Sequence, residues 1–211
     1  VNEGGKMKTI LLTMLAAAAL FAGCKKEGQQ TEQKMEATAE VQTPDTTKIP
    51  QAGQPEDPSN PQVIMETDSG TIVLELFPKE APITVENFLK LVNQKFYDGL
   101  VFHRVIPGFM IQGGDPKGNG SGGPGWTIQG EFGARKHVLG TLSMARTADP
   151  NSAGSQFFIC VATAPHLDGQ YAAFGQAVSG AEVAVKISTV PRDAMDKPLS
   201  PVHIKRAYQK K

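Results

Sequence analysis

The segment from Phe102 to Asp115 holds side chains that could do chemistry without a nucleophile or a metal. Arg104 stays charged at any working pH and offers a rigid fan of hydrogen-bond donors. Phe109 and Met110 add aromatic and thioether surface, and Gln112 adds an amide. Alone, an arginine beside an apolar strand is usually a surface charge, and such apolar residues are usually core. Together they could form an apolar slot with a fixed cation beside it.

Other chemistries have weaker support in the sequence. The histidines have no metal-ligand spacing, so we expect neither a metal nor a cofactor; they are His103, His137, His166 and His203. Strand alternation places His103 on the face opposite Arg104, which predicts a structural role. The run 118–123 has the form of a dinucleotide-binding glycine pattern, but prolines bracket it and no helix follows, so we expect a flexible loop. No serine lies in a hydrolase nucleophile elbow.

Short strands dominate the elements that must position these residues. Two apolar runs around Asp68-Ser69-Gly70 predict a hairpin of 63–67 and 71–76. Pro82 suits the first turn of a helix, and a second helix is expected to end at Pro191. Further strands are expected at 101–106, 109–112, 138–145, 156–161, 172–178 and 202–208. This pattern predicts a mainly β fold, a closed eight-stranded antiparallel β-barrel capped by two α-helices.

The N-terminal residues are typical of a targeting signal rather than of part of this fold. A basic start at Met7 and Lys8 is followed by an apolar run, 10–22, which is too short to span a membrane but suits a signal peptide. The run ends Leu20-Phe21-Ala22-Gly23-Cys24, which is similar to a bacterial lipobox. We therefore expect 1–24 to be upstream residues and a lipoprotein signal peptide, with Cys24 lipidated.

The polar residues 25–61 are expected to form a disordered linker to a single domain at 62–211. The anchor would place the protein in the cell envelope, attached to the membrane on the extracytoplasmic side. Phe21 stands where lipoboxes usually have leucine, so a cleaved, soluble periplasmic protein is the alternative.

Composition excludes some partners. Lys and Arg number 21, Asp and Glu number 21, and no basic cluster is interleaved with aromatic residues, so we expect no nucleic acid. Cys160 ends an apolar run and is expected to be a buried thiol, so no disulfide is expected. We expect a monomer.

Several blocks, taken in order, resemble the cyclophilins, a family of peptidyl-prolyl cis/trans isomerases. The residues 102–115 resemble the central signature of the family, and the other blocks are Ser143-Met144-Ala145, Gly154-Ser155-Gln156-Phe157-Phe158-Ile159, Leu167-Asp168-Gly169 and Phe174-Gly175. The resemblance covers residues 63–208. It implies a cyclophilin-like barrel that binds proline-containing polypeptides and accelerates X-Pro isomerisation during folding of exported proteins.

The resemblance also implies roles for individual residues. Arg104, Gln112 and Phe158 would be catalytic, with Arg104 stabilising the twisted amide. The substrate-binding positions would be Phe109, Met110, Ala145, Arg146, Gln156, His166, Leu167 and Tyr171. Three of these depart from the common pattern: His166 replaces a tryptophan, which puts cyclosporin sensitivity in doubt, Tyr171 replaces a histidine, and Arg146 replaces an asparagine. The added charge of Arg146 would favour acidic residues near the substrate proline.

Two other functions stay open at this point. A binding module would hold proline-bearing loops without turnover, although such a scaffold has no need of the full set of site residues. A hydrolase would need an activated serine and a base, and no motif supplies them.

Overall fold

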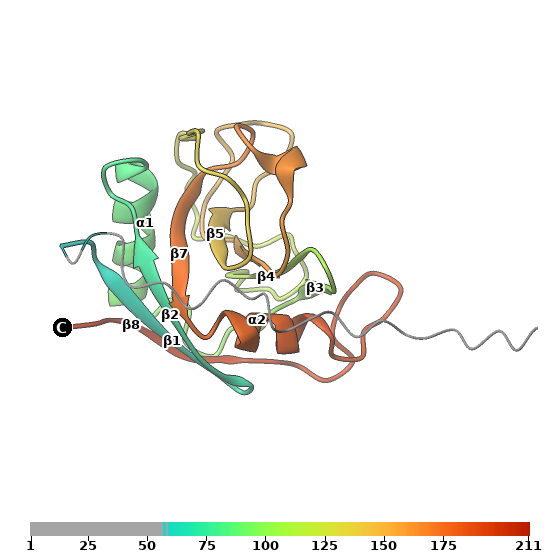
Figure 1. Ribbon diagram of the computed structural model, residues 1–211. Helices are drawn as coiled ribbons and strands as arrows, with labels where there is room; N and C mark the ends of the chain where they lie inside the picture. Colours follow the sequence, from blue (N-terminus) through green and yellow to red (C-terminus); the bar gives the residue numbers. More distant parts are fainter. Residues whose placement is uncertain (1–56, 58) are drawn as a thin grey trace, which may run out of the picture. The chain divides into compact units, whose positions relative to one another are not determined.

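The computed structural model describes residue 57 and residues 59–211 (Figure 1). The predicted signal peptide, Cys24 and most of the predicted linker lie outside the described residues. The described end of that linker contacts the sheet, because Asp57 N–H and the Asn60 amide both donate to the Glu75 carboxylate, at 3.0 and 2.9 Å. Among the described helices, none is long and apolar enough to cross a membrane.

Eight antiparallel strands form one sheet in the order β3-β4-β6-β5-β7-β2-β1-β8. The strands are β1 (Gln62–Thr67), β2 (Gly70–Leu76), β3 (Arg104–Ile106), β4 (Met110–Gly113), β5 (Thr141–Met144), β6 (Phe157–Cys160), β7 (Ala173–Ser179) and β8 (Ile204–Gln209). The predicted hairpin is confirmed, since β1 and β2 pair from Gln62↔Glu75 to Thr67↔Gly70. A mainly β fold with eight antiparallel strands is therefore confirmed.

The prediction of a closed barrel overstated the closure. β3 and β8 stand at the two ends of the strand order and do not pair with each other. One isolated bridge, Val101↔His203, lies between the segments that precede them. Phe102 N–H donates to the Val202 carbonyl at 3.0 Å, so this gap is crossed by single backbone bonds. β3 is too short to extend the ladder, and the sheet is a half-barrel.

Two helices accompany the sheet, as predicted, together with a short 3-10 helix, η2 (Pro165–Leu167). α1 (Pro82–Asn93) lies next to β8, and α2 (Ala181–Ser188) contacts β2, β3 and β4 (Figure 1). The free N–H groups at the start of α1 are satisfied from a distant loop, because Glu131 accepts the backbone N–H of Thr84 at 2.8 Å. This carboxylate ties the loop between β4 and β5 to α1. Its negative charge also interacts favourably with the positive, N-terminal end of the helix dipole.

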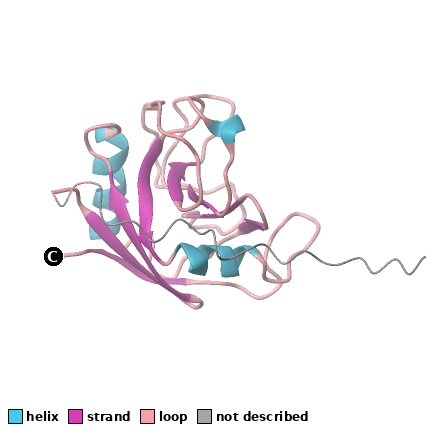
Figure 2. Cartoon of the chain, viewed as in Figure 1, coloured by secondary structure: helices cyan, strands magenta, loops and turns pink. Residues whose placement is uncertain are grey.

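Several strands are shorter than predicted, and long loops join them (Figure 2). The predicted strand at 138–145 begins only at Thr141. Gly140 has φ 86°, a left-handed conformation that breaks the extended backbone. The apolar run could not reveal this turn, because Val138 and Leu139 have the same residue types as a strand.

An aromatic cluster fills the main core. Phe88 on α1 is fully buried, and its ring centroid lies 5.1 Å from Tyr97, 5.7 Å from Phe157 and 5.2 Å from Phe174. Phe157 belongs to β6 and Phe174 to β7, so one helical side chain joins α1 to two strands. Edge-to-face ring contacts add to the burial of apolar area.

We predict that Phe88→Ala lowers the free energy of unfolding by about 3–5 kcal/mol, because it removes a buried ring and leaves a cavity. Urea unfolding followed by circular dichroism measures this loss. Ile83→Ala on the same helix is the control, since Ile83 is 42% exposed and its loss should cost far less. Equal losses for the two variants would contradict the assignment of Phe88 as the central contact of this core.

Candidate active site

Strand register places the predicted catalytic residues in one row. Arg104 on β3 is opposite Gln112 on β4, and Gln112 is opposite Phe158 on β6. Directly opposed residues of an antiparallel pair project to the same face of a sheet. The cation, the amide and the aromatic ring therefore lie side by side, although the chain separates them widely.

A cavity of about 230 Å³ lies along this row. Nine of the eleven residues predicted for the site line it: Arg104, Phe109, Met110, Gln112, Ala145, Arg146, Phe158, Leu167 and Tyr171. We call this cavity the slot. Gln156 lies in the adjoining larger cavity, and the His166 ring lies against Phe109 at the edge, with centroids 5.4 Å apart. The structure thus brings all of the predicted site residues together.

The apolar wall of the slot is separate from the main core. Met110, Phe158, Cys160, Ala164 and Leu167 form a cluster of their own. Cys160 is fully buried in it, and burial raises the pKa of its thiol to about 12, so the thiol is protonated at neutral pH. Cys160 is therefore a small apolar residue beneath the slot, as predicted.

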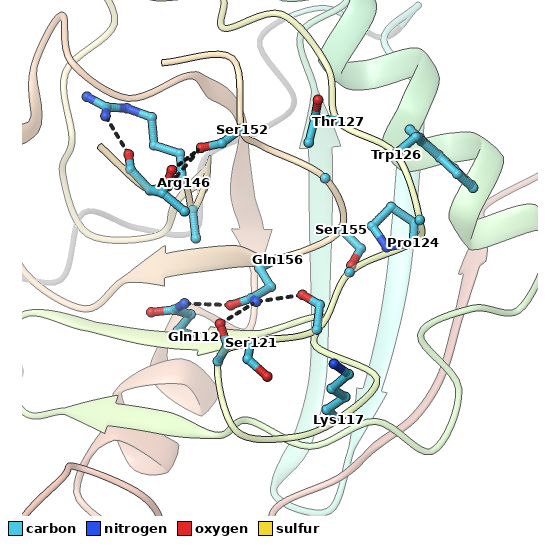
Figure 3. A pocket seen from close by; sticks show the side chains of 17 residues that line it. Gln112, Lys117, Ser121, Pro124, Trp126, Thr127, Arg146, Ser152, Ser155 and Gln156 are labelled. Atoms are coloured by element: carbon cyan, nitrogen blue, oxygen red, sulfur yellow. Dashed lines mark hydrogen bonds between the residues drawn. The ribbon is translucent and has the colours of Figure 1, made fainter. Parts of the chain in front are cut away.

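Two glutamines join the slot to a second cavity of about 590 Å³, which we call the groove (Figure 3). The Gln112 amide N–H donates to Gln156 Oε1 at 3.0 Å. Gln156 Nε2 donates in turn to the carbonyls of Gly120 and Gly122, at 2.9 and 2.8 Å. Within the described residues, the hydrogen bond of the Gln112 side chain runs to Gln156 and not to Arg104.

The glycine-rich loop is fixed at its base rather than free. The buried Asp115 carboxylate accepts the backbone N–H groups of Lys117, Asn119 and Gly120, at 2.7, 3.0 and 2.6 Å. Burial alone would raise the pKa of Asp115, but these bonds outweigh it and lower the pKa. A side chain at Gly122 would meet Asp115 Oδ1 at 1.9 Å. The loop predicted to be flexible is thus tied at its base, where its amides bind Asp115.

Arg104 has a charged neighbour that the sequence did not indicate. Its side chain is 45% exposed, and its Nε lies 3.7 Å from Asp196 Oδ2. Asp196 also pairs with Arg192 at 3.2 Å, and its carbonyl accepts the Val105 N–H at 2.8 Å. Asp196 belongs to the loop after α2, so only the fold brings it beside β3. The contact recorded between the two side chains is made by Nε of Arg104.

A buried polar chain supports the slot from behind. His137 Nδ1 lies 3.2 Å from Asp168 Oδ1, and His137 Nε2 lies 3.0 Å from Ser143 Oγ. The His137 ring stacks on Phe158 with centroids 6.0 Å apart. Burial lowers the pKa of His137, so its ring is neutral at pH 7. Nδ1–H then donates to Asp168, and Ser143 O–H donates to Nε2.

This Ser–His–Asp chain has the residue types of a hydrolase triad but not its accessibility. Ser143 and His137 are both fully buried, and Ser143 pairs with Phe158 across β5 and β6. A substrate carbonyl in the slot would meet the Phe158 ring first. The chain is suited to holding Phe158 in place, not to nucleophilic attack.

His103 has the structural placement that strand alternation predicts. It is 6% exposed, whereas the neighbouring Arg104 is exposed. Neither of its ring nitrogens has a hydrogen-bond partner in the described residues. Burial lowers the pKa of His103, which keeps the ring neutral. Across residue 57 and residues 59–211, no group of three or more His, Cys, Asp and Glu side chains could hold a metal ion.

Asp168→Asn tests the support behind the slot. The His137 backbone N–H, the Lys136 side chain and the His137 ring lower the pKa of Asp168 to about 2. A carboxyl group whose pKa is depressed on folding stabilises the protein above its ordinary pKa, and this contribution disappears as the pH falls through the folded value. We predict that wild type is more stable than Asp168→Asn by a constant amount above about pH 4, and that the gap closes between about pH 4 and 2.

Urea unfolding at a series of pH values measures this gap. Glu86→Gln, which removes an exposed carboxylate from α1, is the control for the loss of a negative charge elsewhere on the surface. A gap between wild type and Asp168→Asn that does not change with pH would contradict the ionic role of Asp168.

Comparison with known proteins agrees with this geometry. Residues 62–209 match the family model for cyclophilin type peptidyl-prolyl cis-trans isomerase/CLD. A peptidyl-prolyl cis-trans isomerase of Synechococcus elongatus is 58% identical over 115 residues, 54% of this chain and 79% of the relative. Isomerase ppi1 of Schizosaccharomyces pombe is 43% identical over 150 residues, 69% and 96% of the two chains. A crystal structure of a Cryptosporidium parvum cyclophilin in the presence of the dipeptide Ala-Pro superposes with TM-score 0.68 and 36% identity, over 71% and 99% of the chains. The chain belongs to the cyclophilin-type peptidyl-prolyl cis-trans isomerases.

Proposed function

We propose that this isomerase works by binding a twisted prolyl amide in the slot, without a covalent intermediate, and that its substrates are exported proteins during folding. The observation that carries the mechanism is the row formed by Arg104, Gln112 and Phe158 beside the apolar slot. The dipeptide Ala-Pro present with the Cryptosporidium relative supports proline-containing peptides as the ligand class.

The barrier to be lowered arises from amide resonance. Rotation about a peptide C–N bond costs roughly 18–20 kcal/mol, and an X-Pro bond takes tens to hundreds of seconds to isomerise unaided. No bond breaks in this reaction, so the catalyst needs neither a nucleophile nor a metal. It must bind the twisted amide more tightly than either planar form.

Arg104 is suited to this preference because twisting localises a lone pair on the prolyl nitrogen. A guanidinium stays charged and offers several N–H donors in one plane. Asp196 lies against Nε, so the terminal N–H groups of Arg104 can face the slot. Phe109, Met110 and Phe158 would hold the proline ring in a site that excludes water, where the cation acts more strongly.

Gln112 would orient the rest of the peptide. Its Nε2 donates to Gln156, so its Oε1 is left to accept a backbone N–H of the substrate. Gln156 is itself held by the carbonyls of Gly120 and Gly122, which fixes the direction of the pair. The glutamines thus position the peptide, and Arg104 supplies the transition-state preference.

We predict that Arg104→Ala lowers kcat/KM for a proline-containing peptide by roughly 10²–10³-fold, the usual cost of removing one preorganised electrostatic group. The kcat/KM of Arg104→Lys should lie between those of wild type and Arg104→Ala, because lysine keeps the charge but lacks the planar donors. Peptide exchange followed by NMR gives the rates, and circular dichroism confirms that the variants fold.

Arg206→Ala is the matched control, since this arginine is exposed and pairs with Glu66 away from the slot. Full activity of Arg104→Ala would contradict the mechanism. A wild-type protein that binds the peptide without accelerating its exchange would instead favour the binding module.

The exported location rests on the sequence before the domain. The family match begins at residue 62, after the lipobox-like segment and the polar linker. A lipid at Cys24 would attach the isomerase to the membrane on the extracytoplasmic side, and the linker would let it reach unfolded chains nearby. Without the lipid, the same signal would deliver a soluble periplasmic enzyme.

For the anchor, we predict that a bacterial host supplied with a labelled fatty acid incorporates the label into the full chain but not into Cys24→Ser. Cys160→Ser is the control and should keep the label, because that thiol is buried in the fold. Labelling that persists in Cys24→Ser, or is absent from wild type, would contradict the anchor.

A further inference from the structure

The slot and the groove are continuous, and one arginine lies where they meet. Gln112, Ala145 and Arg146 line both cavities. The groove holds about 590 Å³, more than twice the volume of the slot, and residues of the glycine-rich loop line it (Figure 3). A peptide with its proline in the slot would therefore have neighbouring residues in the groove, past Arg146.

The hydrogen-bond partners of the Arg146 side chain in the described residues are all carbonyl groups. Nε and Nη2 donate to the Gln170 carbonyl at 3.1 and 2.9 Å, and Nη1 donates to the Thr147 carbonyl at 2.8 Å. The guanidinium lies over the Tyr171 ring, 4.7 Å from its centroid, and 5.6 Å from that of Phe132. These contacts fix the position of the charge without cancelling it, because none of these partners is a carboxylate.

The charged residues that line the two cavities all have the same sign. Arg104 lines the slot, Lys117 lines the groove, and Arg146 lines both, whereas no Asp or Glu of the described residues lines either. Asp115 ties the backbone of Lys117 in place but is itself buried beneath the loop. Clefts lined by one sign of charge concentrate the field and attract the opposite charge.

We propose that the groove is a subsite for an acidic side chain, so that the enzyme prefers prolines with Asp or Glu two or three residues away on one side. This inference rests on the proposed function of the slot. Successive residues of an extended peptide are about 3.3–3.6 Å apart, so two or three residues carry the chain out of the slot and into the groove. Arg146 would meet the acidic group at the junction, and Lys117 would meet it further along the groove.

Peptides that differ at one position test this preference. Each carries one proline, neutral caps at both ends, and Glu, Gln or Lys at one position up to three residues before or after the proline. We expect kcat/KM to rank Glu above Gln above Lys, with roughly two- to fivefold between Glu and Gln, at two adjacent positions on one side only. The ranking should flatten in about 1 M salt, where charges are screened within about 3 Å.

Variants of the full chain assign the preference to the groove. Arg146→Gln should abolish most of the ratio between Glu and Gln peptides, and Arg146→Lys should retain it, because it keeps the charge. Lys210→Gln removes a charge at the end of β8, outside both cavities, and should leave the ratio unchanged.

The outcomes separate this inference from the function on which it rests. Exchange that wild type does not accelerate for any peptide would overturn both. Equal acceleration of Glu, Gln and Lys peptides would overturn the acidic subsite alone. So would a Glu preference that is the same at every position, or one that Arg146→Gln leaves intact, because the attraction would then be diffuse.

Discussion

The antiparallel register of β3, β4 and β6 determines how a cation and an apolar slot come to share one face. Arg104, Gln112 and Phe158 are opposed in turn, so a slip of one residue between these strands would send one of them to the opposite face. The main core protects this register, because Phe157, next to Phe158, points into the aromatic cluster around Phe88. Adjacent residues of β6 therefore face opposite ways, with Phe157 in the core and Phe158 at the slot.

Two carboxylates, one buried and one partly exposed, then hold the loops that complete the site. Asp115 gathers the glycine-rich loop, and Asp168 orients His137 behind Phe158. Each accepts backbone N–H groups, and these hydrogen bonds lower the pKa of each carboxyl group and keep it ionised. Short strands and hydrogen bonds to these carboxylates therefore support the site. They hold the loop between β4 and β5 beside the groove.

Much of this could be predicted from the sequence, and the failures have physical causes. The order of the blocks pointed to residues that the fold brings together at the slot, and apolar runs predicted the strands. The groups that act across long loops could not be seen: Asp196 beside Arg104, and Ser143 and Asp168 in line with His137. Their residue types are common on surfaces, and only the fold gives them their partners. Closure of the barrel was overstated because strand count alone does not say whether the edge strands meet.

We propose that Arg104 binds the twisted amide better than the planar one. The most direct test compares the dissociation constant of a proline peptide with its exchange rate on the same samples of wild type and Arg104→Ala, by titration and exchange NMR. If Arg104 has this role, the two proteins have nearly equal affinity for the planar peptide, and Arg104→Ala shows a large loss in the rate of exchange of the bound peptide. A loss of affinity that accounts for the whole loss of kcat/KM, with the bound peptide still exchanging at the wild-type rate, would contradict it.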